Sequence, residues 1–269
     1  MKTTTHVSRF AILATLVSSL AFAACDDDKD DLVSRVLGDA SAKPVASATV
    51  AAYDAAPSPP AVKAPIVCAP GPAVDFHGNA ALEAEVRRKL QRDGGAITQA
   101  DLKTIKSINL SQAQTDSLDP CVFPLFTGVK DLFLGRGELD DLSPIASLSQ
   151  LITLRASLNK VSDLKPLETM TKMDRLDLSH TAIHDISSLS GMLSLTELQL
   201  DGTEVVDLTP LANIKTLERL SIRNTPVVDV SALKNAKKLR FLYIEGSPVA
   251  DTNVLSAISG LKIVRKGQM

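Results

Sequence analysis

The chain has 269 residues, of which 45% are apolar and 22% are charged, and its formal net charge is −2. This length allows one or two domains with a sizeable core, and the apolar content excludes a chain that is disordered throughout. A near-neutral charge argues against a dedicated DNA-binding protein, because such a protein needs a basic face. Seven Phe, two Tyr and no Trp argue against RNA binding by base stacking, and three Cys are too few for a disulfide scaffold.

Residues 1–24 are typical of a secretory signal peptide. Lys2 and Arg9 precede an apolar stretch that ends in small residues and is too short to span a bilayer comfortably. Cys25 follows two Ala, an arrangement that resembles the signal of bacterial lipoproteins. The resemblance implies that Cys25 is acylated and that the exported protein is held by lipid to a membrane of the bacterial cell envelope. Ordinary secretion, with Cys25 near the cleavage point by coincidence, is the alternative.

Residues 25–75 are expected to form a disordered tether behind the acylated Cys. The run from Asp26 to Asp31 is acidic, and seven of the 14 Pro lie in residues 32–75. Such a segment buries too little apolar surface to offset the entropy of ordering it. The acidic run lacks the Gly and the closing Glu of an EF-hand, so we interpret it as solvated charge and not as a calcium site.

From Val129 to Gly260 the sequence repeats every 22 residues, six times without a gap. Apolar residues recur at repeat positions 1, 4, 6, 11 and 17, and position 13 is always Asp. Six copies in register indicate a repeat architecture, in which each unit buries its apolar face by stacking on its neighbours. Position 4 is held by Leu132, Leu154, Leu176, Leu198, Leu220 and Leu242, and position 13 by Asp141, Asp163, Asp185, Asp207, Asp229 and Asp251.

Over about residues 105–264 the chain resembles the leucine-rich repeats of bacterial internalin-like proteins, in their 22-residue class. The resemblance implies an α/β fold: a right-handed solenoid with a curved parallel β-sheet on its concave face and turns or 3₁₀ segments on its convex face. The L-x-x-L-x-L stretch independently favours a short strand with Leu on one side. Pro144, Pro166 and Pro210 share position 16, where a convex turn is expected to begin and a missing N–H is tolerated.

Two polar columns are expected to support the turns. The family usually has Asn at position 9, whereas this chain has mostly hydroxyl side chains there, so we expect a Thr ladder in place of an Asn ladder. The Asp column at position 13 is expected to cap the convex turns; metal binding is the alternative, but the copies stack along the axis instead of converging. Position 9 is held by Gly137, Asn159, Thr181, Thr203, Thr225 and Ser247.

Both ends of the stack need closing elements. Residues 76–104 are expected to form a helical amino-terminal cap, with a helix over about 80–92 that Asn79 begins and Gly94 closes. Thr98 and Asp101 give a weaker capping signal before a second, short helical turn, an order that resembles the cap of the same family. Residues 105–128 form a degenerate first repeat, and residues 261–269 offer a last partial strand.

The three cysteines predict one disulfide. If Cys25 is acylated, Cys68 and Cys121 remain as a pair, and an exported location is oxidising. We therefore expect a Cys68–Cys121 disulfide that pins the end of the tether to the first repeat. Two free thiols are the alternative.

A binding function is expected on the concave face, which repeat positions 3, 5 and 7 line. These positions hold four Arg, five acidic residues, three aromatic residues and no Lys. Enrichment in Arg and aromatic residues is typical of protein interfaces, whereas a solvated sheet with charges paired across strands is the alternative. Phe241, Tyr243 and Arg219 are the strongest anchors. The candidate protein-binding residues are Phe133, Arg155, Arg175, Asp177, Glu197, Arg219, Arg223, Phe241 and Tyr243.

Catalysis finds little support in the sequence. His180 and His184 are four residues apart, which suits zinc on a helix, but they fall in a turn after a strand. The sequence has no nucleophile elbow, no Gly-rich phosphate loop and no Cys-x-x-Cys motif. We therefore predict no enzyme, no catalytic residue, no cofactor and no metal site.

These features together predict an exported, lipid-anchored, monomeric protein whose leucine-rich repeats bind another protein through the concave face. The sequence does not name that partner, and nucleic acid is not expected to be one. A binder of cell-envelope glycan or cell-wall polymer is the alternative, because Phe241 and Tyr243 with Arg suit a sugar ligand, although sugar sites usually use Trp.

Overall fold

The computed structural model describes residue 68 and residues 71–265. The chain divides into two units, residues 1–61 and 62–269, and the first unit lies outside the described residues. The predicted signal peptide, the lipidation site Cys25 and most of the predicted tether therefore lie outside them too, and they stay predictions.

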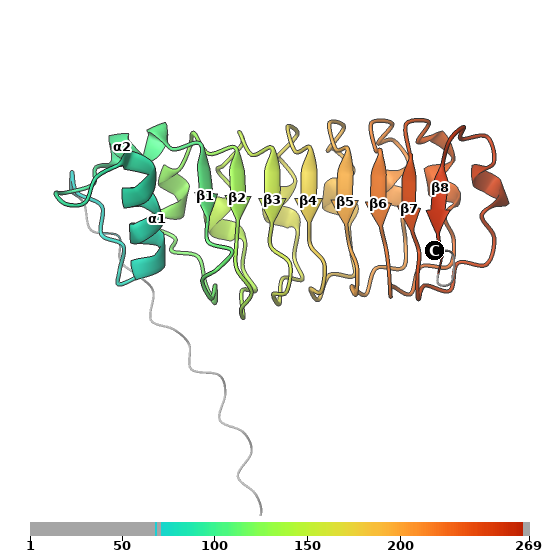
Figure 1. Ribbon diagram of the computed structural model, residues 1–269, viewed down its shortest axis with the longest axis horizontal. Coiled ribbons are helices and arrows are strands. Elements are labelled where there is room, and N and C mark those ends of the chain that lie inside the picture. The colour runs from blue at the N-terminus through green and yellow to red at the C-terminus, as the bar shows by residue number, and fades with distance from the viewer. Residues whose placement is uncertain (1–67, 69–70, 266–269) are drawn as a thin grey trace, which may run out of the picture. The chain divides into compact units, whose positions relative to one another are not determined.

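Eight short strands lie side by side in chain order and form one parallel sheet within the described residues (Figure 1). The strands are β1 (Ser107–Asn109), β2 (Asp131–Phe133), β3 (Thr153–Arg155), β4 (Arg175–Asp177), β5 (Glu197–Gln199), β6 (Arg219–Ser221), β7 (Phe241–Tyr243) and β8 (Lys262–Val264). From β2 to β7 the paired residues are 22 apart, so that Leu132 pairs with Leu154 and Leu154 with Leu176. The period of the sequence thus sets equal repeat positions next to each other, and the predicted leucine-rich repeat solenoid is confirmed.

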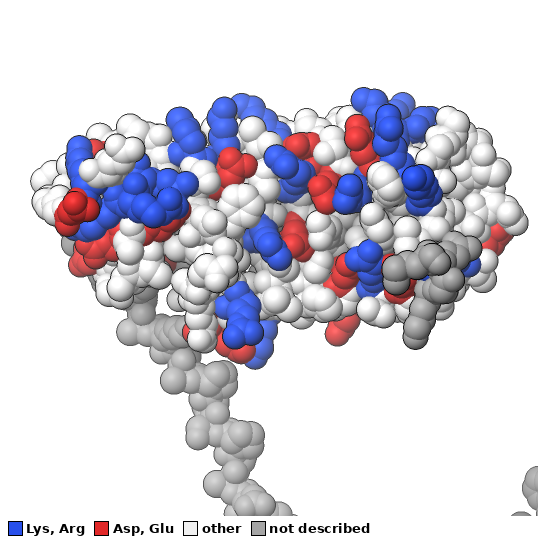
Figure 2. Space-filling model, in the orientation of Figure 1, with Lys and Arg blue, Asp and Glu red and all other residues white. Residues whose placement is uncertain are grey.

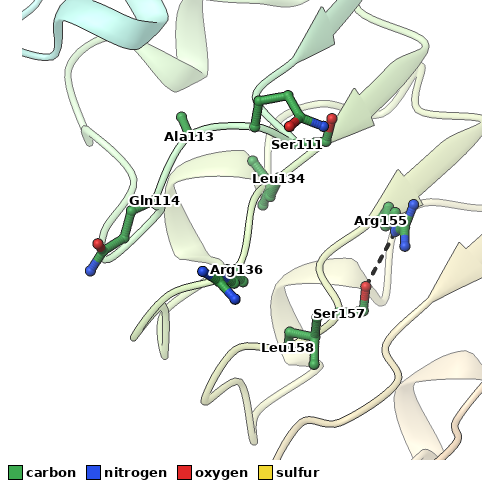
Figure 3. Close-up of a pocket in the computed structure, with 9 residues that line it drawn as sticks. Ser111, Ala113, Gln114, Leu134, Arg136, Arg155, Ser157 and Leu158 are labelled. Atoms are coloured by element: carbon green, nitrogen blue, oxygen red, sulfur yellow. Dashed lines mark hydrogen bonds between the residues drawn. The ribbon is translucent and has the colours of Figure 1, made fainter.

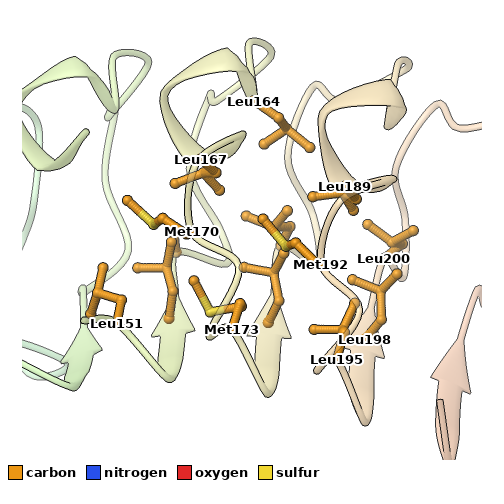
Figure 4. Close-up of a cluster of buried hydrophobic side chains, with 14 of the residues drawn as sticks. Leu151, Leu164, Leu167, Met170, Met173, Leu189, Met192, Leu195, Leu198 and Leu200 are labelled. Atoms are coloured by element: carbon orange, nitrogen blue, oxygen red, sulfur yellow. The ribbon is translucent and has the colours of Figure 1, made fainter. Parts of the chain in front are cut away.

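The Leu column at position 4 lies in a continuous core. All six of these Leu side chains are at most 1% exposed. Figure 4 shows Leu side chains of the strands and of the turns gathered around Met170, Met173 and Met192, which are fully buried. Because Met is unbranched and flexible, it fills irregular gaps between Leu side chains, so these Met residues serve packing. Burial of one Leu side chain stabilises the fold by roughly 1.5–3 kcal/mol, a gain that each repeat obtains only beside its neighbours.

Short 3₁₀ segments lie behind the sheet in Figure 1 and close the core on that side. They are η1 (Phe123–Leu125), η2 (Ser143–Ile145), η3 (Lys165–Leu167), η4 (Ser187–Leu189), η5 (Thr209–Leu211), η6 (Ser231–Asn235) and η7 (Asn253–Leu255). Pro144, Pro166 and Pro210 lie in the first turn of η2, η3 and η5, where an N–H has no helical partner. The prediction for position 16 is therefore confirmed.

The Asp column at position 13 fixes the start of these segments. In all six repeats the Asp Oδ1 accepts a hydrogen bond from the backbone N–H two residues later, at 2.7–2.8 Å. Such Asx turns satisfy an N–H that the turn leaves without a backbone partner, and the predicted capping role is confirmed. Asp119 makes the same contact with the N–H of Cys121 at 2.7 Å, so it is a seventh member of the column.

The hydroxyl column at position 9 differs from the predicted ladder. Thr181, Thr203 and Thr225 donate to the carbonyl oxygen three residues earlier in their own turn, at 2.6–2.7 Å. A Thr side chain is short, and this contact uses its single O–H. Asn159 has two N–H donors and does join two repeats, because its Nδ2 also donates to a carbonyl of the preceding repeat at 3.0 Å. Of the hydroxyl pairs in neighbouring described repeats, Thr225 and Ser247 are in contact, at 3.1 Å.

Two helices precede the sheet, as predicted. α1 (Ala80–Leu90) begins at Asn79, whose side chain accepts from the N–H of Leu82, and α2 (Gln99–Thr104) begins with the predicted capping box of Thr98 and Asp101. α1 ends two residues earlier than predicted, and Gly94 does not close it. Gln91 takes the left-handed conformation at φ 55°, and its N–H bonds the carbonyls of the last turn. Neither described helix has the length and apolarity needed to cross a membrane.

α1 covers the edge of the sheet at β1. The carboxylate of Glu85, which is 7% exposed, accepts from the N–H of Asn109 at 2.9 Å. Arg88 and Lys89 lie 2.7 and 3.7 Å from the same carboxylate, which offsets the cost of burying its charge. Because an open strand edge invites pairing with another chain, this contact ends the sheet at β1. At the other end, β8 is the predicted partial strand.

The segment before α1 is joined to the first repeat by two contacts. Cys68 and Cys121 form the predicted disulfide, with an S–S distance of 1.99 Å and a Cα–Cα distance of 5.3 Å. Nδ1 of His77 lies 2.7 Å from Oδ2 of Asp119, and this hydrogen bond raises the pKa of His77 above its usual value. Asp119 therefore caps η1 with one oxygen and holds the amino-terminal segment with the other.

The Asp column predicts a loss of stability in acid. Hydrogen bonds from the N–H and hydroxyl of Ser187 and of Ser231 lower the pKa of Asp185 and Asp229, and those from Thr209 lower the pKa of Asp207. A lowered pKa in the folded state stabilises the fold above the pKa of the unfolded chain, and this stabilisation is lost as the pH falls through the folded value.

We expect the free energy of unfolding of the native chain to fall more steeply between about pH 5 and about pH 2 than that of the D185N/D207N/D229N variant. Asn keeps the oxygen acceptor but does not titrate in this range, so the variant isolates the charge. Urea unfolding followed by circular dichroism measures both profiles, and parallel profiles would contradict the assignment.

Candidate binding interface

The side of the sheet that faces away from the 3₁₀ segments is called the open face below. Positions 3 and 5 of each strand lie on it, and position 7 follows directly after the strand. All nine predicted protein-binding residues lie at these positions, from β2 to the turn after β6 and on β7. Figure 2 shows Lys and Arg mixed with Asp and Glu on this side, so no single sign of charge dominates it.

Five of the nine residues line one shallow hollow. This hollow has a volume of about 270 Å³ and lies across β2 to β5. A wall of this kind, with one aromatic ring among charged side chains, is a contact surface for a side chain of a partner and is too open to enclose a small ligand. The five predicted residues in it are Phe133, Arg155, Arg175, Asp177 and Glu197.

Charges on this part of the face pair across neighbouring strands. Nε of Arg155 lies 3.2 Å from Oδ2 of Asp177, and Nε of Arg219 lies 3.8 Å from Oε1 of Glu197. Both Arg side chains are about half exposed, so each pair contributes about 0–1 kcal/mol to stability. This pairing agrees with the alternative of a solvated, self-neutralised sheet for β3 to β6, and it leaves little net charge for binding there.

The other four residues, Arg219, Arg223, Phe241 and Tyr243, form what we call the aromatic–arginine cluster. The rings of Phe241 and Tyr243 stack with centroids 6.3 Å apart and planes at 13°. The guanidinium carbon of Arg219 lies 5.2 Å from the Phe241 centroid, and that of Arg223 lies 4.4 Å from the Tyr243 centroid. These distances fit cation–π contacts, which hold the four side chains in a fixed arrangement.

Arg223 is the most firmly held member of the cluster. Its Nε pairs with Glu245, its Nη1 lies 3.4 Å from Oδ2 of Asp201, and its backbone N–H donates to Oδ1 of Asp201 at 2.8 Å. Partial burial lowers the pKa of Arg223, but hydrogen bonds and charges of Glu245 and Asp201 outweigh it, so the net shift is upward. The cation is therefore permanently charged and clamped between two carboxylates, with its flat face on Tyr243.

The sequence analysis missed Lys262, which joins the cluster from β8. Its Nζ lies 5.8 Å from the Phe241 centroid. A strict 22-residue count places Lys262 at position 2, whereas the structure pairs it with Phe241 at position 3, because β7 and β8 are offset by 21 residues. The conclusion that Lys is absent from this face therefore holds for the six counted repeats and fails at the last strand.

The histidines and acids of the described residues do not converge on a catalytic arrangement. His180 and His184 are exposed in the turn after β4, and His180 has a left-handed φ of 57°. His77, Asp119 and Cys121 lie within 4.8 Å of one another, but the sulfur of Cys121 is bonded to Cys68 and so offers no thiolate ligand. That cluster holds the amino-terminal segment to the first repeat.

The fold is shared with solved bacterial proteins. No protein-family profile and no curated protein sequence matches the chain. It is similar to an internalin, InlF, from Listeria monocytogenes, with 25% identity and a TM-score of 0.62 over 68% of this chain and 54% of that one. It is also similar to internalin C2 of the same species, with 24% identity and a TM-score of 0.59 over 70% of this chain and 93% of that one.

A third similar structure is a leucine-rich repeat protein from Leptospira interrogans. It is 18% identical, with a TM-score of 0.50 over 61% of this chain and 50% of that one. This chain thus spans about half the length of InlF and nearly all of internalin C2. The chain is a leucine-rich repeat protein with an internalin-like fold, a scaffold that is typical of protein-interaction modules and generally not enzymatic.

The clamp on Arg223 predicts a measurable contribution to stability. Arg223→Gln removes the cation between Asp201 and Glu245, and we expect the free energy of unfolding to fall by about 1 kcal/mol, because the site is partly exposed. Urea unfolding at neutral pH measures the change. Arg240→Gln is the matched control, since Arg240 is exposed directly before β7; equal effects of the two substitutions would contradict the clamp.

Proposed function

We propose that the chain belongs to an exported bacterial protein, lipid-anchored through Cys25, that binds another protein through the open face of its sheet. The leucine-rich repeat fold supports a role in protein interaction. The observation that carries the proposal to this face is the aromatic–arginine cluster. The protein acts as a monomeric, non-enzymatic scaffold and uses no cofactor and no nucleic acid.

The cluster has the chemistry of an interface anchor. Aromatic and Arg side chains carry much of the binding energy at protein interfaces, and Phe241 and Tyr243 are half-buried rings on adjacent positions of one strand. Their stacking and the contacts with Arg219 and Arg223 order them before a partner arrives. A partner therefore loses less entropy on binding here than on binding flexible side chains.

The charge pairs indicate the chemistry of the partner. Glu197, Asp201 and Glu245 already face Arg side chains of this chain. A highly charged partner surface would have to displace these pairs, and a surface with apolar groups at its centre would not. We therefore propose a protein partner that places apolar or aromatic side chains against Phe241 and Tyr243, with polar groups around them.

Partner capture tests the open face. The full chain is cross-linked to envelope extract of the producing bacterium, and the captured protein is then titrated against purified variants. We expect Phe241→Ala and Tyr243→Ala each to weaken binding about 30-fold, the effect typical of an interface anchor. Leu193→Ala is the matched control, because Leu193 is 57% exposed and lies outside the strands.

Equal binding by all three variants would contradict an open-face interface. Retention of purified cell-wall material by the native chain, with loss in Tyr243→Ala and no captured protein, would replace the protein partner by the glycan or wall polymer. The stacked rings of Phe241 and Tyr243 are the feature that favours this second candidate.

The lipid anchor has its own test. Cys25→Ser removes the only atom to which the acyl group is proposed to attach, so we expect the variant to incorporate no labelled palmitate and to leave the membrane fraction. Asp28→Asn, three residues away, is the control and is expected to behave like the native chain. Labelled, membrane-bound Cys25→Ser protein would contradict the anchor.

A further inference from the structure

The turn after β1 is two residues longer than the turn after β2. β1 and β2 are offset by 24 residues, since Ile108 pairs with Leu132. Beyond the turn the offset is 22: the N–H of Thr115 donates to the carbonyl of Arg136, as the N–H of Gly137 donates to that of Leu158. The two additional residues of the first repeat therefore lie between Asn109 and Thr115.

This longer turn forms one wall of a pocket at the carboxyl ends of β1, β2 and β3 (Figure 3). The pocket has a volume of about 520 Å³, which is in the range of small-molecule sites. In Figure 3, Arg136 lies between the turn that carries Gln114 and the side chain of Leu158. The lining residues are Ser111, Gln112, Ala113, Gln114, Leu134, Arg136, Arg155, Ser157 and Leu158.

The polar lining is rich in hydrogen-bond donors and contains no acidic residue. Arg136 is exposed, and within the described residues its guanidinium has no carboxylate within 4 Å. Arg155 directs its Nε to Asp177 at 3.2 Å and to Oγ of Ser157 at 3.3 Å, so its charge is partly balanced. Two guanidinium groups therefore border the same cavity, and one of them has its full donor fork available.

Leu158 gives an independent indication of a ligand. Its backbone lies in the left-handed region at φ 60°, and its side chain is 52% exposed. The equivalent positions of later repeats include Gly202, Asn224 and Gly246, which are residue types that tolerate this conformation well. A Leu there costs backbone free energy and buries little surface of its own, and such cost is a mark of functional sites.

We infer that this pocket binds a small oxyanion, a carboxylate or a phosphate group. Arg136 supplies the bidentate, charge-assisted contact that both groups share, Ser111 and Gln112 supply further donors, and Leu158 covers the apolar part of the ligand. The site is separate from the aromatic–arginine cluster and goes beyond the proposed protein-binding function, because it takes a small molecule at the turns after the strands.

Titration of the full chain tests the site. Inorganic phosphate and glucuronate are the two probes, and backbone amide shifts by NMR are the readout. We expect saturable shifts at residues 111–114 and at Leu158, and about tenfold weaker binding of the preferred anion by Arg136→Gln. Arg240→Gln removes the same charge from an exposed residue outside the pocket and is expected to bind like the native chain.

Leu158→Gly separates binding from folding. Gly relieves the left-handed backbone, so we expect thermal stability equal to or above that of the native chain together with weaker binding. Tighter binding of phosphate or of glucuronate identifies which oxyanion the site prefers. No saturable shift with either probe, unchanged binding by Arg136→Gln, or an equal loss in Arg240→Gln would overturn the inference.

Discussion

Parallel pairing of each three-residue strand with the strands of the adjoining repeats is the constraint on which the rest of the molecule depends. Three residues are too few to form a stable strand alone, so every repeat relies on its neighbours for backbone hydrogen bonds and for burial of its Leu. The spacing of 22 residues fixes which side chains are neighbours. The ion pair of Arg155 with Asp177 and the contact of Arg219 with Phe241 follow from this register.

The period of Leu and Asp in the sequence was sufficient to predict the strands, the 3₁₀ segments and the core. It succeeded because burial of Leu176 or capping by Asp207 depends on position within a repeat and hardly on the neighbouring sequence. The bonding of the Thr hydroxyls was not predictable in this way, since a hydroxyl has acceptors both in its own turn and in the next one. Gln91 shows the same limit, because tertiary contacts settled where α1 ends.

Departures from the period were also hidden in the sequence, and they lie at both ends of the sheet. A residue added to or removed from a turn leaves the apolar pattern of the strands intact, so counting alone does not reveal where it sits. The longer turn after β1 produced the Arg136 pocket, and the shorter spacing before β8 brought Lys262 beside Phe241. The regular middle of the solenoid supplies rigidity, and its irregular ends supply the sites with distinctive chemistry.

The open-face interface is tested most sharply by hydroxyl-radical footprinting of the chain with and without its captured partner. An interface on the aromatic–arginine cluster predicts that Phe241 and Tyr243 lose reactivity in the complex, while the exposed Leu193 and Val228, which lie outside the strands, stay reactive. Protection of Leu193 and Val228 with unchanged reactivity of Phe241 and Tyr243 would place the partner elsewhere and contradict the proposal.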